Sequence, residues 1–266
     1  ANGGILTPAD EIAEEAGLTE NVLPYHFDKT VYENRLYFGY GKAQEEAPLK
    51  YGPNIADWPK MQPLTENILL EAACVIYDPV TTTDELIPSG ETSSYRSNPL
   101  RLAEFTLSRK DPEYVTRAKQ IAAAEKARLD YIGGDLQAEE VFKEAYREIG
   151  DTVILAHTTG IGSVVAAVKP GDGSAREQAA SCQKVLGGWA NIASAYATKR
   201  YRSNLINWGM LPFTVDDFDG LALENGDRIY IKGIRKAVEN AETDIKAALY
   251  RKNGTKEDIL LHLTDL

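Results

Sequence analysis

Apolar residues occur along this chain in short runs whose spacing switches between that of strands and that of helices. Residues 68–77 form the clearest strand, because they are apolar, rich in β-branched side chains and followed by Asp78 and Pro79. Further strands are predicted at residues 152–157, 163–168, 227–233, 245–252 and 257–263. Asn253 and Gly254 separate the last two runs and are typical of a hairpin turn.

Two other segments show the spacing of three and four residues that is typical of an amphipathic helix. In the region 111–150, the recurring apolar positions are Ala138, Val141, Ala145 and Ile149. In residues 175–186, the apolar stripe consists of Ala175, Ala179, Cys182 and Leu186. Strands and helices mixed in this way, with no internal repeat, predict an α/β or α+β domain.

Residues 1–65 follow neither spacing. A short helix is predicted between Thr7 and Gly17, because Thr7-Pro8 followed by acidic residues is a typical helix start and Gly17 a typical end. Beyond it, prolines and glycines interrupt every periodic run, with aromatic residues between them. We expect an extended strap whose aromatic side chains pack on a larger body. The predicted domains are therefore a strap or linker, residues 1–65, and a folded domain, residues 66–266.

The composition is that of an ordinary globular protein. The chain has 266 residues, of which 43% are hydrophobic and 26% charged, and 29 Lys and Arg against 40 Asp and Glu give a net charge of -11. These values exclude a disordered chain, and no apolar run is long enough to span a membrane. The acidity argues against nucleic acid as a partner, because that binding rests on clustered Lys and Arg.

Cysteine and histidine are too sparse and scattered to form a metal site. The two cysteines, Cys74 and Cys182, lie far apart in the sequence and indicate neither a disulfide framework nor a metal knuckle. The three histidines are also far apart, so no metal ligation is expected from this chain. The first residues carry no secretory signal and the chain opens on Ala rather than Met. We therefore expect a cytoplasmic protein and a piece of a longer chain.

The segment that enters the second predicted helix is the most informative for function. It reads Gly171-Asp172-Gly173-Ser174-Ala175-Arg176-Glu177. Ser174 and Glu177 have the spacing of a capping box, which explains both side chains by structure alone, and the pattern favours that interpretation. Alternatively, the glycines let a ligand approach the backbone, the helix start attracts an anion, and Arg176 binds a carboxylate.

Two further segments are candidates for binding residues. Thr82-Thr83-Asp84 is followed by Gly90, Tyr95 and Arg96, and its composition favours a polar surface loop. The basic residues Lys199, Arg200 and Arg202 lead into Ser203-Asn204-Leu205 and then into residues 209–213. Their simplest interpretation is a solvated helix end, whose cations offset the negative terminus of the helix dipole.

Taken together, these segments resemble the C-terminal swivelling domain of the aconitase superfamily. That family has Gly-Ser-Ser-Arg-Glu, then Thr-Asn-Leu or Ser-Asn-Leu, then Gly-(Leu/Val)-Leu-Pro, in the order of residues 173–177, 203–205 and 209–212 here. Thr82-Thr83-Asp84 with Arg96 resembles the family's Thr-Thr-Asp loop and its later substrate arginine. The resemblance covers residues 66–266. It implies an α/β swivelling domain of the β/β/α type, with a mixed sheet flanked by helices.

The resemblance also implies a mechanism and roles for named residues. In that family a serine alkoxide removes a proton beside a carboxylate, while an iron of a [4Fe-4S] cluster assists the loss of hydroxide. Ser174 would be the base, Arg176 and Arg96 would bind substrate carboxylates, Thr83 would contact substrate, and Asp84 would orient an arginine. The family's cluster is held by three cysteines on other domains. Because this chain has two scattered cysteines, we expect no cluster on it and no activity without the N-terminal cluster-bearing domains.

Several departures from the family pattern leave the substrate open. Ala175 stands where the family usually has a second serine, Glu85 where aconitases have His, and Pro170 where an aromatic residue is customary. The region 111–150 is also larger than expected for isopropylmalate isomerase small subunits. We expect a divergent hydratase that acts on a small hydroxy di- or tricarboxylate. The alternatives are a small subunit of a heteromeric isopropylmalate-type isomerase and an RNA-binding regulator, as some cluster-free relatives are.

Overall fold

The structure, a computed structural model, describes residues 3–18, 26–34 and 39–263. Parts of the expected strap, residues 19–25 and 35–38, lie outside the described residues. The chain divides into two units, residues 1–50 and 51–266. The first unit contains the helices α1 (Ala9–Glu15) and α2 (Thr30–Glu33). Helix α1 starts later than predicted, because Pro8 rather than Thr7 is its N-cap residue.

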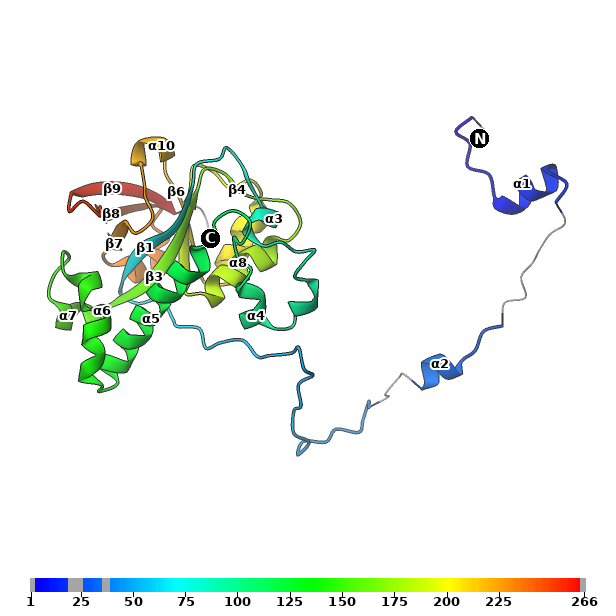
Figure 1. Cartoon of the computed structure of the whole chain (residues 1–266), viewed down its shortest axis with the longest axis horizontal. Coiled ribbons are helices and arrows are strands. Elements are labelled where there is room, and N and C mark those ends of the chain that lie inside the picture. Colours follow the sequence, from blue (N-terminus) through cyan, green and yellow to red (C-terminus); the bar gives the residue numbers. More distant parts are fainter. Residues whose placement is uncertain (1–2, 19–25, 35–38, 264–266) are drawn as a thin grey trace. The chain divides into compact units, whose positions relative to one another are not determined.

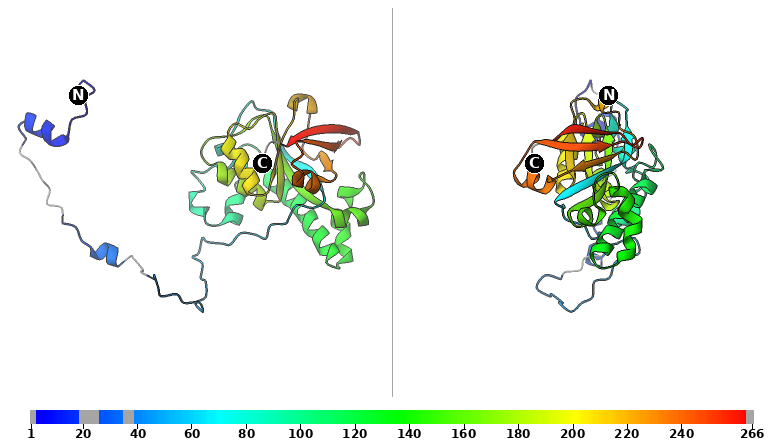
Figure 2. Two further views of the ribbon diagram at one scale, coloured as in Figure 1. Left: turned by 180° about the vertical axis from the view of Figure 1, so that it is seen from behind. Right: turned by 90° about the vertical axis from the view of Figure 1, so that its left-hand side faces the viewer.

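The second unit is built on a sheet that closes into a barrel (Figures 1 and 2). In order around the barrel, its strands are β1 (Asn67–Ile76), β3 (Thr159–Ala167), β5 (Gly188–Ala193), β6 (Leu211–Thr214), β9 (Lys256–Leu263), β8 (Asp244–Tyr250) and β7 (Arg228–Ile231). The pairs from β1 to β6 are parallel, and the others are antiparallel. The expected α/β class with a mixed sheet is confirmed, and so is the hairpin between β8 and β9.

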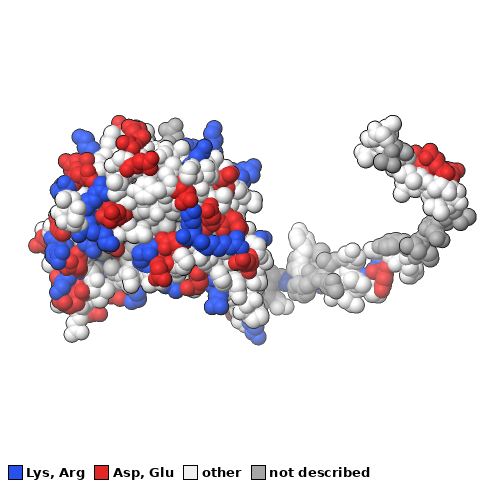
Figure 3. Space-filling model, turned by 45° about the horizontal axis from the view of Figure 1, so that its top comes forward, with Lys and Arg blue, Asp and Glu red and all other residues white. Residues whose placement is uncertain are grey.

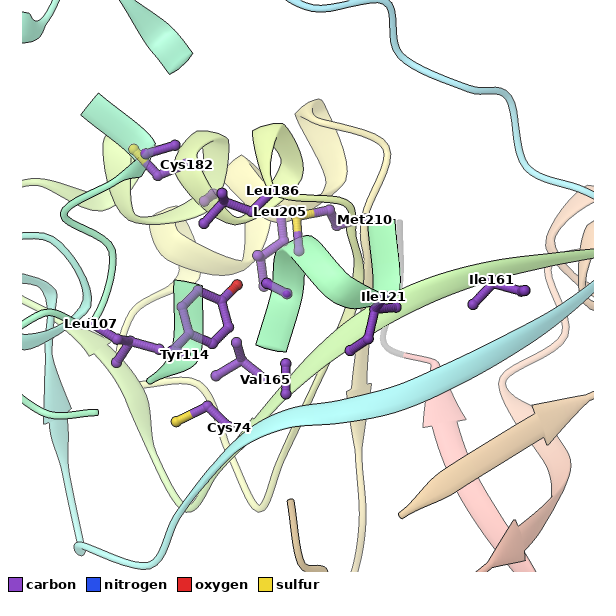
Figure 4. Close-up of a cluster of buried hydrophobic side chains, with 14 of the residues drawn as sticks. Cys74, Leu107, Tyr114, Ile121, Ile161, Val165, Cys182, Leu186, Leu205 and Met210 are labelled. Atoms are coloured by element: carbon purple, nitrogen blue, oxygen red, sulfur yellow. The ribbon is translucent and has the colours of Figure 1, made fainter. Parts of the chain in front are cut away.

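Strand β1 is buried on both faces, as its apolar run predicts. Ile68 and Leu70 pack in a core to which every strand of the barrel contributes. Leu69 and Ala73 belong to a second core, which lies between the sheet and the helices. Figure 4 shows part of this second core, with Tyr114 among side chains from strands and helices. The sheet is therefore covered by helices on its outer face and filled by its own side chains inside.

The helices of the second unit connect the strands, and most of them cover this outer face, whereas α10 and α11 contribute side chains to the core inside the barrel (Figure 1). They are α3 (Thr83–Leu86), η1 (Ser93–Tyr95), α4 (Pro99–Ala103), α5 (Tyr114–Ile132), η2 (Leu136–Ala138), α6 (Glu139–Tyr146), α7 (Thr152–Thr158), α8 (Arg176–Val185), α9 (Lys199–Asn207), α10 (Phe218–Leu221) and α11 (Ile234–Glu239). A separate two-stranded sheet joins β2 (Thr81–Thr82) to β4 (Pro170–Asp172). The stripe predicted for residues 175–186 is buried, at Ala175, Ala179, Cys182 and Leu186.

Residues 152–157, predicted as a strand, form helix α7 instead. Asp151 is the N-cap residue, and its Oδ1 atom accepts a hydrogen bond from the Ile154 amide at 3.1 Å. Val153 and Ile154 are exposed, so no sheet uses their β-branched side chains. A local cap has therefore outweighed the strand preference of this run.

The predicted amphipathic helix in residues 111–150 is divided, and its apolar stripe is only partly buried. Ala145 is in the core, and Ala138 and Ile149 pack against it. Helix α5 ends before Gly133, and α6 follows after η2. In α6 the predicted stripe residue Val141 is exposed, whereas Phe142 and Tyr146 are fully buried. Their rings pack edge to face with centroids 5.8 Å apart. The two large aromatic residues thus set the orientation of α6, because burying them removes more apolar surface from water than burying Val141 and Ala138.

A buried ion pair ties α5 to its neighbours. Arg128 and Glu125, one turn apart on α5, are joined by two hydrogen bonds of 2.6 and 2.7 Å. Arg128 also donates to the Ala156 carbonyl of α7, and Glu125 accepts from the Ile161 amide of β3. Every charge of the pair is therefore hydrogen-bonded, as burial requires.

The last part of the expected strap belongs to the second unit. Trp58 packs on Trp208 with ring centroids 4.4 Å apart, and the Ala56 amide donates to the Ser97 carbonyl at 3.0 Å. Trp58 thus packs as an aromatic residue of the strap was expected to. The domain boundary between residues 65 and 66 stays a prediction.

The described surface carries both signs of charge. On the face seen in Figure 3, acidic and basic side chains are interspersed. None of the described helices combines the length and apolarity that crossing a bilayer requires.

His262 lies between two carboxylates at the edge of the β8–β9 hairpin. Its Nδ1 atom is 2.9 Å from Asp244 Oδ1, and its Nε2 atom is 3.5 Å from Asp216 Oδ2. The hydrogen bond with Asp244 raises the pKa of His262 above its ordinary value; desolvation opposes this rise, and Asp216 adds to it. The protonated ring therefore stabilises the folded state.

This contact predicts a pH-dependent stability. The stabilisation should be fully present below the unfolded-state pKa of about 6.5 and should be lost as the pH rises through the higher folded-state pKa. Urea unfolding of the wild-type protein and of His262→Gln between pH 5 and 8.5 should give free-energy differences that shrink as the pH rises. The matched control is His157→Gln, because His157 has no acidic partner among the described residues. A difference for His262→Gln that does not change with pH would contradict the prediction.

Candidate active site

The turn between β4 and α8 is held beside the loop after β1 by the two-stranded sheet. In this sheet Thr82 pairs with Asp172, so the next residues, Thr83 and Gly173, come into contact. Thr83 is buried, and a Cβ atom on Gly173 would lie 2.2 Å from its Oγ1 atom. Gly173 also has φ of +131°, a conformation that other residues rarely adopt. Two candidate segments that are distant in sequence therefore meet at this turn.

Ser174 lies in the turn with an exposed side chain. The capping box predicted for Ser174 and Glu177 is not formed: Ala175 is the N-cap residue of α8, and no side chain caps the helix. The Ser174 hydroxyl has no hydrogen bond with any described residue. The amides of the first turn and the positive end of the helix dipole can therefore stabilise a negative charge at this position.

A capping box occurs instead at the start of α3. Thr82 Oγ1 accepts a hydrogen bond from the Glu85 amide at 3.2 Å, and Glu85 Oε2 accepts one from the Thr82 amide at 2.7 Å. Desolvation raises the pKa of Glu85, but the bonds from Thr82 and the contact with Lys110 outweigh it, so the pKa lies below its ordinary value. The sequence analysis missed this box, although its Thr-x-x-Glu spacing was visible. The carboxylate of Glu85 thus has a structural role here.

Two arginines near the turn have nitrogen atoms without partners. Arg176 is the first residue of α8, and its Nε atom is buried without a hydrogen bond. Arg202 Nε, on α9, is in the same state. Helix α9 is held against β4, because Thr198 Oγ1 donates to the Gly171 carbonyl at 3.1 Å. Neither arginine forms an ion pair with an acid in the described ranges, so both retain binding capacity for an anion.

The basic segment that precedes Ser203 lies at the start of a helix. Lys199 is the first residue of α9, and Thr198 is its N-cap residue. This corrects the expectation that these cations offset a negative helix end, because the N-terminal end is positive. Lys199 and Arg200 are exposed and pair with no acid that the structure describes. Helices α8 and α9 pack together, so the cations of both helix starts lie on the same part of the domain.

Asp84 and Arg96 are positioned by different contacts. Asp84 accepts a hydrogen bond from Arg109 Nη1 at 2.6 Å, and Arg109 also binds Glu91 at 2.5 Å. Arg96 faces α8 across a hollow of about 40 Å³, which is also lined by Trp58, Glu177, Gln178 and Ser181. This hollow is too small for an organic acid, and Arg176 does not line it. The structure thus brings Arg96 to α8 without joining it to Arg176 in one pocket.

The two cysteines do not fit an iron–sulfur cluster. Cys74 and Cys182 are buried in the core shown in Figure 4. Burial raises the pKa of the Cys74 thiol, and it raises that of Cys182 to about 12. Both therefore remain thiols, whereas cluster ligands are thiolates. Among the described residues, no group of three or more His, Cys, Asp and Glu side chains is placed to hold a metal ion.

A comparison with known families covers the residues around the turn. Residues 122–217 match the model of the family described as aconitase C-terminal domain, so this part of the chain is similar to that family. The matched part of the domain includes Ser174, Arg176 and Arg202, whereas Thr83 and Arg96 lie before it.

Among solved structures, this chain is similar to 3-isopropylmalate dehydratase (leuD) from Methanocaldococcus jannaschii. The identity is 18% and the TM-score 0.41, with 73% of this chain and 82% of that chain covered.

The contact between Thr83 and Gly173 predicts that Gly173→Ala destabilises the protein. The new Cβ atom would clash with Thr83 Oγ1 in a strained backbone conformation, and we expect a loss of about 2–5 kcal/mol in the free energy of unfolding. Urea denaturation measures this free energy of unfolding.

The matched control is Gly254→Ala, because Gly254 also has positive φ but nothing within 4 Å of the Cβ position. It should lose about 1–2 kcal/mol. Equal losses for the two variants would show that the close contact has no energetic role.

Proposed function

We propose that this chain is the swivelling domain of an aconitase-type hydro-lyase, which dehydrates and rehydrates a small hydroxy di- or tricarboxylate. The observation that carries the proposal is the uncapped start of α8, where Ser174 is exposed and unbonded beside Arg176. A serine that only capped the helix would use its hydroxyl on a first-turn amide. The family match at residues 122–217 supports the same assignment.

In this proposal, Ser174 is the base. A serine hydroxyl is a poor base near neutral pH, so its alkoxide needs strong electrostatic stabilisation. The first-turn amides of α8, the helix dipole and the Arg176 guanidinium supply it. The alkoxide takes a proton from the carbon next to a substrate carboxylate, and the proton stays on Ser174 Oγ. In the reverse reaction, the same hydroxyl returns it.

The arginines bind the substrate carboxylates. Arg176 has a buried Nε atom without a partner, and a carboxylate can accept from its planar fork with two hydrogen bonds. Arg96 belongs to the site if the hollow beside α8 widens when substrate or partner domains bind. Asp84 keeps its orienting role, with Arg109 as the arginine that it orients. Thr83 supports the turn through its contact with Gly173 and lies next to the substrate.

The remaining chemistry belongs to other domains. The cysteines of this chain do not fit a cluster, so we assign the [4Fe-4S] cluster to the N-terminal domains of the parent enzyme. Ser174 and the cations at the starts of α8 and α9 lie at the surface or partly exposed, which leaves them accessible to such a partner. The chain alone should therefore be inactive.

Replacement of Ser174 tests the proposal. In the complete enzyme with its cluster assembled under anaerobic conditions, Ser174→Ala should lower kcat by about 10²–10⁴-fold, the usual contribution of a general base. KM should change little, because the carboxylate-binding arginines remain. Thermal unfolding should also be unchanged, since the exposed hydroxyl has no bond to lose.

Ser94→Ala is the matched control, because it removes an exposed hydroxyl from η1, outside the turn. It should retain full kcat. Turnover by Ser174→Ala at the wild-type rate would remove Ser174 from the mechanism. Activity of the isolated chain would refute the assignment of the cluster to other domains.

A further inference from the structure

The ring of Trp189 packs against the glycines of strand β3, outside the turn that contains Ser174. Trp189 of β5 is 5% exposed. A Cβ atom on Gly162 would lie 2.3 Å from Trp189 Cδ1, so only glycine leaves room for the ring. The ring thus fills the space that a side chain of β3 would otherwise take, and its other side is free to contact a different group.

That group is the amine of Lys184, near the end of α8. Its Nζ atom lies 5.0 Å from the centroid of the Trp189 ring, and Lys184 is only 7% exposed. Its one hydrogen bond is a long contact of 3.5 Å with the Gly209 carbonyl. No acid within the described ranges pairs with it. A buried ammonium without a carboxylate is costly, so burial shifts the equilibrium of Lys184 towards the neutral amine.

A pocket of about 250 Å³ opens beside this amine. It is lined by Lys184, Trp189, Met61, Gln62 and Ala122. Glu125 also lines it, but its carboxylate is taken by Arg128 and by the Ile161 amide. The pocket is large enough for a small organic molecule and places it next to Lys184.

The charges around the pocket favour an anionic ligand. Lys60 and Lys126 are exposed and line the pocket together with Lys184. Lys126 is paired with Asp130 at 2.6 Å, and the charge of Glu125 is balanced by Arg128. Lys60 is then the exposed cation without an acidic partner among the described lining residues, so it attracts a phosphate group to the pocket.

Burial lowers the pKa of Lys184 to about 8. Near pH 8, about half of this amine is then neutral, compared with about 0.3% of a lysine with the ordinary pKa. The attraction between the ammonium and the Trp189 ring acts in the opposite direction, and a desolvated contact of this kind contributes about 2 kcal/mol, which offsets part of the lowering. Lys184 therefore has a larger neutral fraction than an exposed lysine, and it lines a pocket with space for a reactant.

We propose that Lys184 is a nucleophile and that the pocket is a site of acylation by small acyl phosphates. The amine nitrogen attacks the acyl carbon and forms an amide bond. The bond between that carbon and the phosphate oxygen breaks, and inorganic phosphate leaves with the electron pair. The proton lost from the amine passes to phosphate or water. The product is a neutral amide over the Trp189 ring, so Lys184 loses its charge. This proposal does not depend on the proposed hydro-lyase function.

Acetyl phosphate and peptide mass spectrometry test the proposal on the full chain. At pH 8, Lys184 should be acetylated at least tenfold faster than Lys60 and Lys126, which line the same pocket and serve as internal controls. The rate at Lys184 should level off at a lower pH than the rates at the exposed lysines. A rate at Lys184 equal to or below those of the two controls would overturn the proposal.

Variants separate the reaction from a change in folding. Lys184→Arg keeps a cation over the Trp189 ring and should remove the fast acetylation while the protein stays folded. Lys126→Arg should keep it. Fast acetylation that persists in Lys184→Arg would assign the reaction to another residue and overturn the proposal. The comparison of lysines within the wild-type protein decides the question even if Lys184→Arg does not fold.

Discussion

The arrangement of the candidate site depends on one short contact, the pairing of β2 with β4. Two residue pairs are enough to align these strands. The pair of Thr82 with Asp172 places Thr83 directly against Gly173. A side chain at Gly173 would separate the strands, so the contact is close only with glycine. The turn of Ser174 and the start of α3 are thereby fixed relative to each other. The barrel supplies the rigid support, since β2 follows β1 and β4 follows β3 in the chain.

The stability of the domain and its proposed function place opposite demands on the helix starts. Helix α8 begins without a side-chain cap, and α9 begins with Lys199 and Arg200, whose charge opposes that of the helix dipole. Helix α3, by contrast, has a complete capping box of Thr82 and Glu85. Helix α3 thus has the side-chain cap that stabilises a helix start, whereas α8 has no such cap and α9 has basic residues at its positive end. Such departures are expected where binding an external anion provides the compensation.

Sequence patterns identified elements whose burial is determined locally. The apolar run of β1, the Asn253-Gly254 hairpin and the stripe of α8 were predicted because each has a clear period or turn residue. The errors occurred where short-range signals competed. At residues 152–157 the Asp151 cap prevailed over β-branched residues, and in α6 the buried aromatic pair of Phe142 and Tyr146 left Val141 of the expected stripe exposed. The first outcome was decided by a local hydrogen bond and the second by packing against neighbouring elements.

For the candidate site, the sequence by itself determined the residue types, their order and the resemblance to the aconitase superfamily. It also located the turn that contains Ser174, because glycines and a helix start are visible as a local pattern. Only the tertiary structure decided that Ser174 does not cap α8, that Asp84 pairs with Arg109, and that Lys184 is buried against a tryptophan. These are contacts between segments that the chain brings together only on folding. Their energies depend on distance and burial in space, which no spacing along the sequence records.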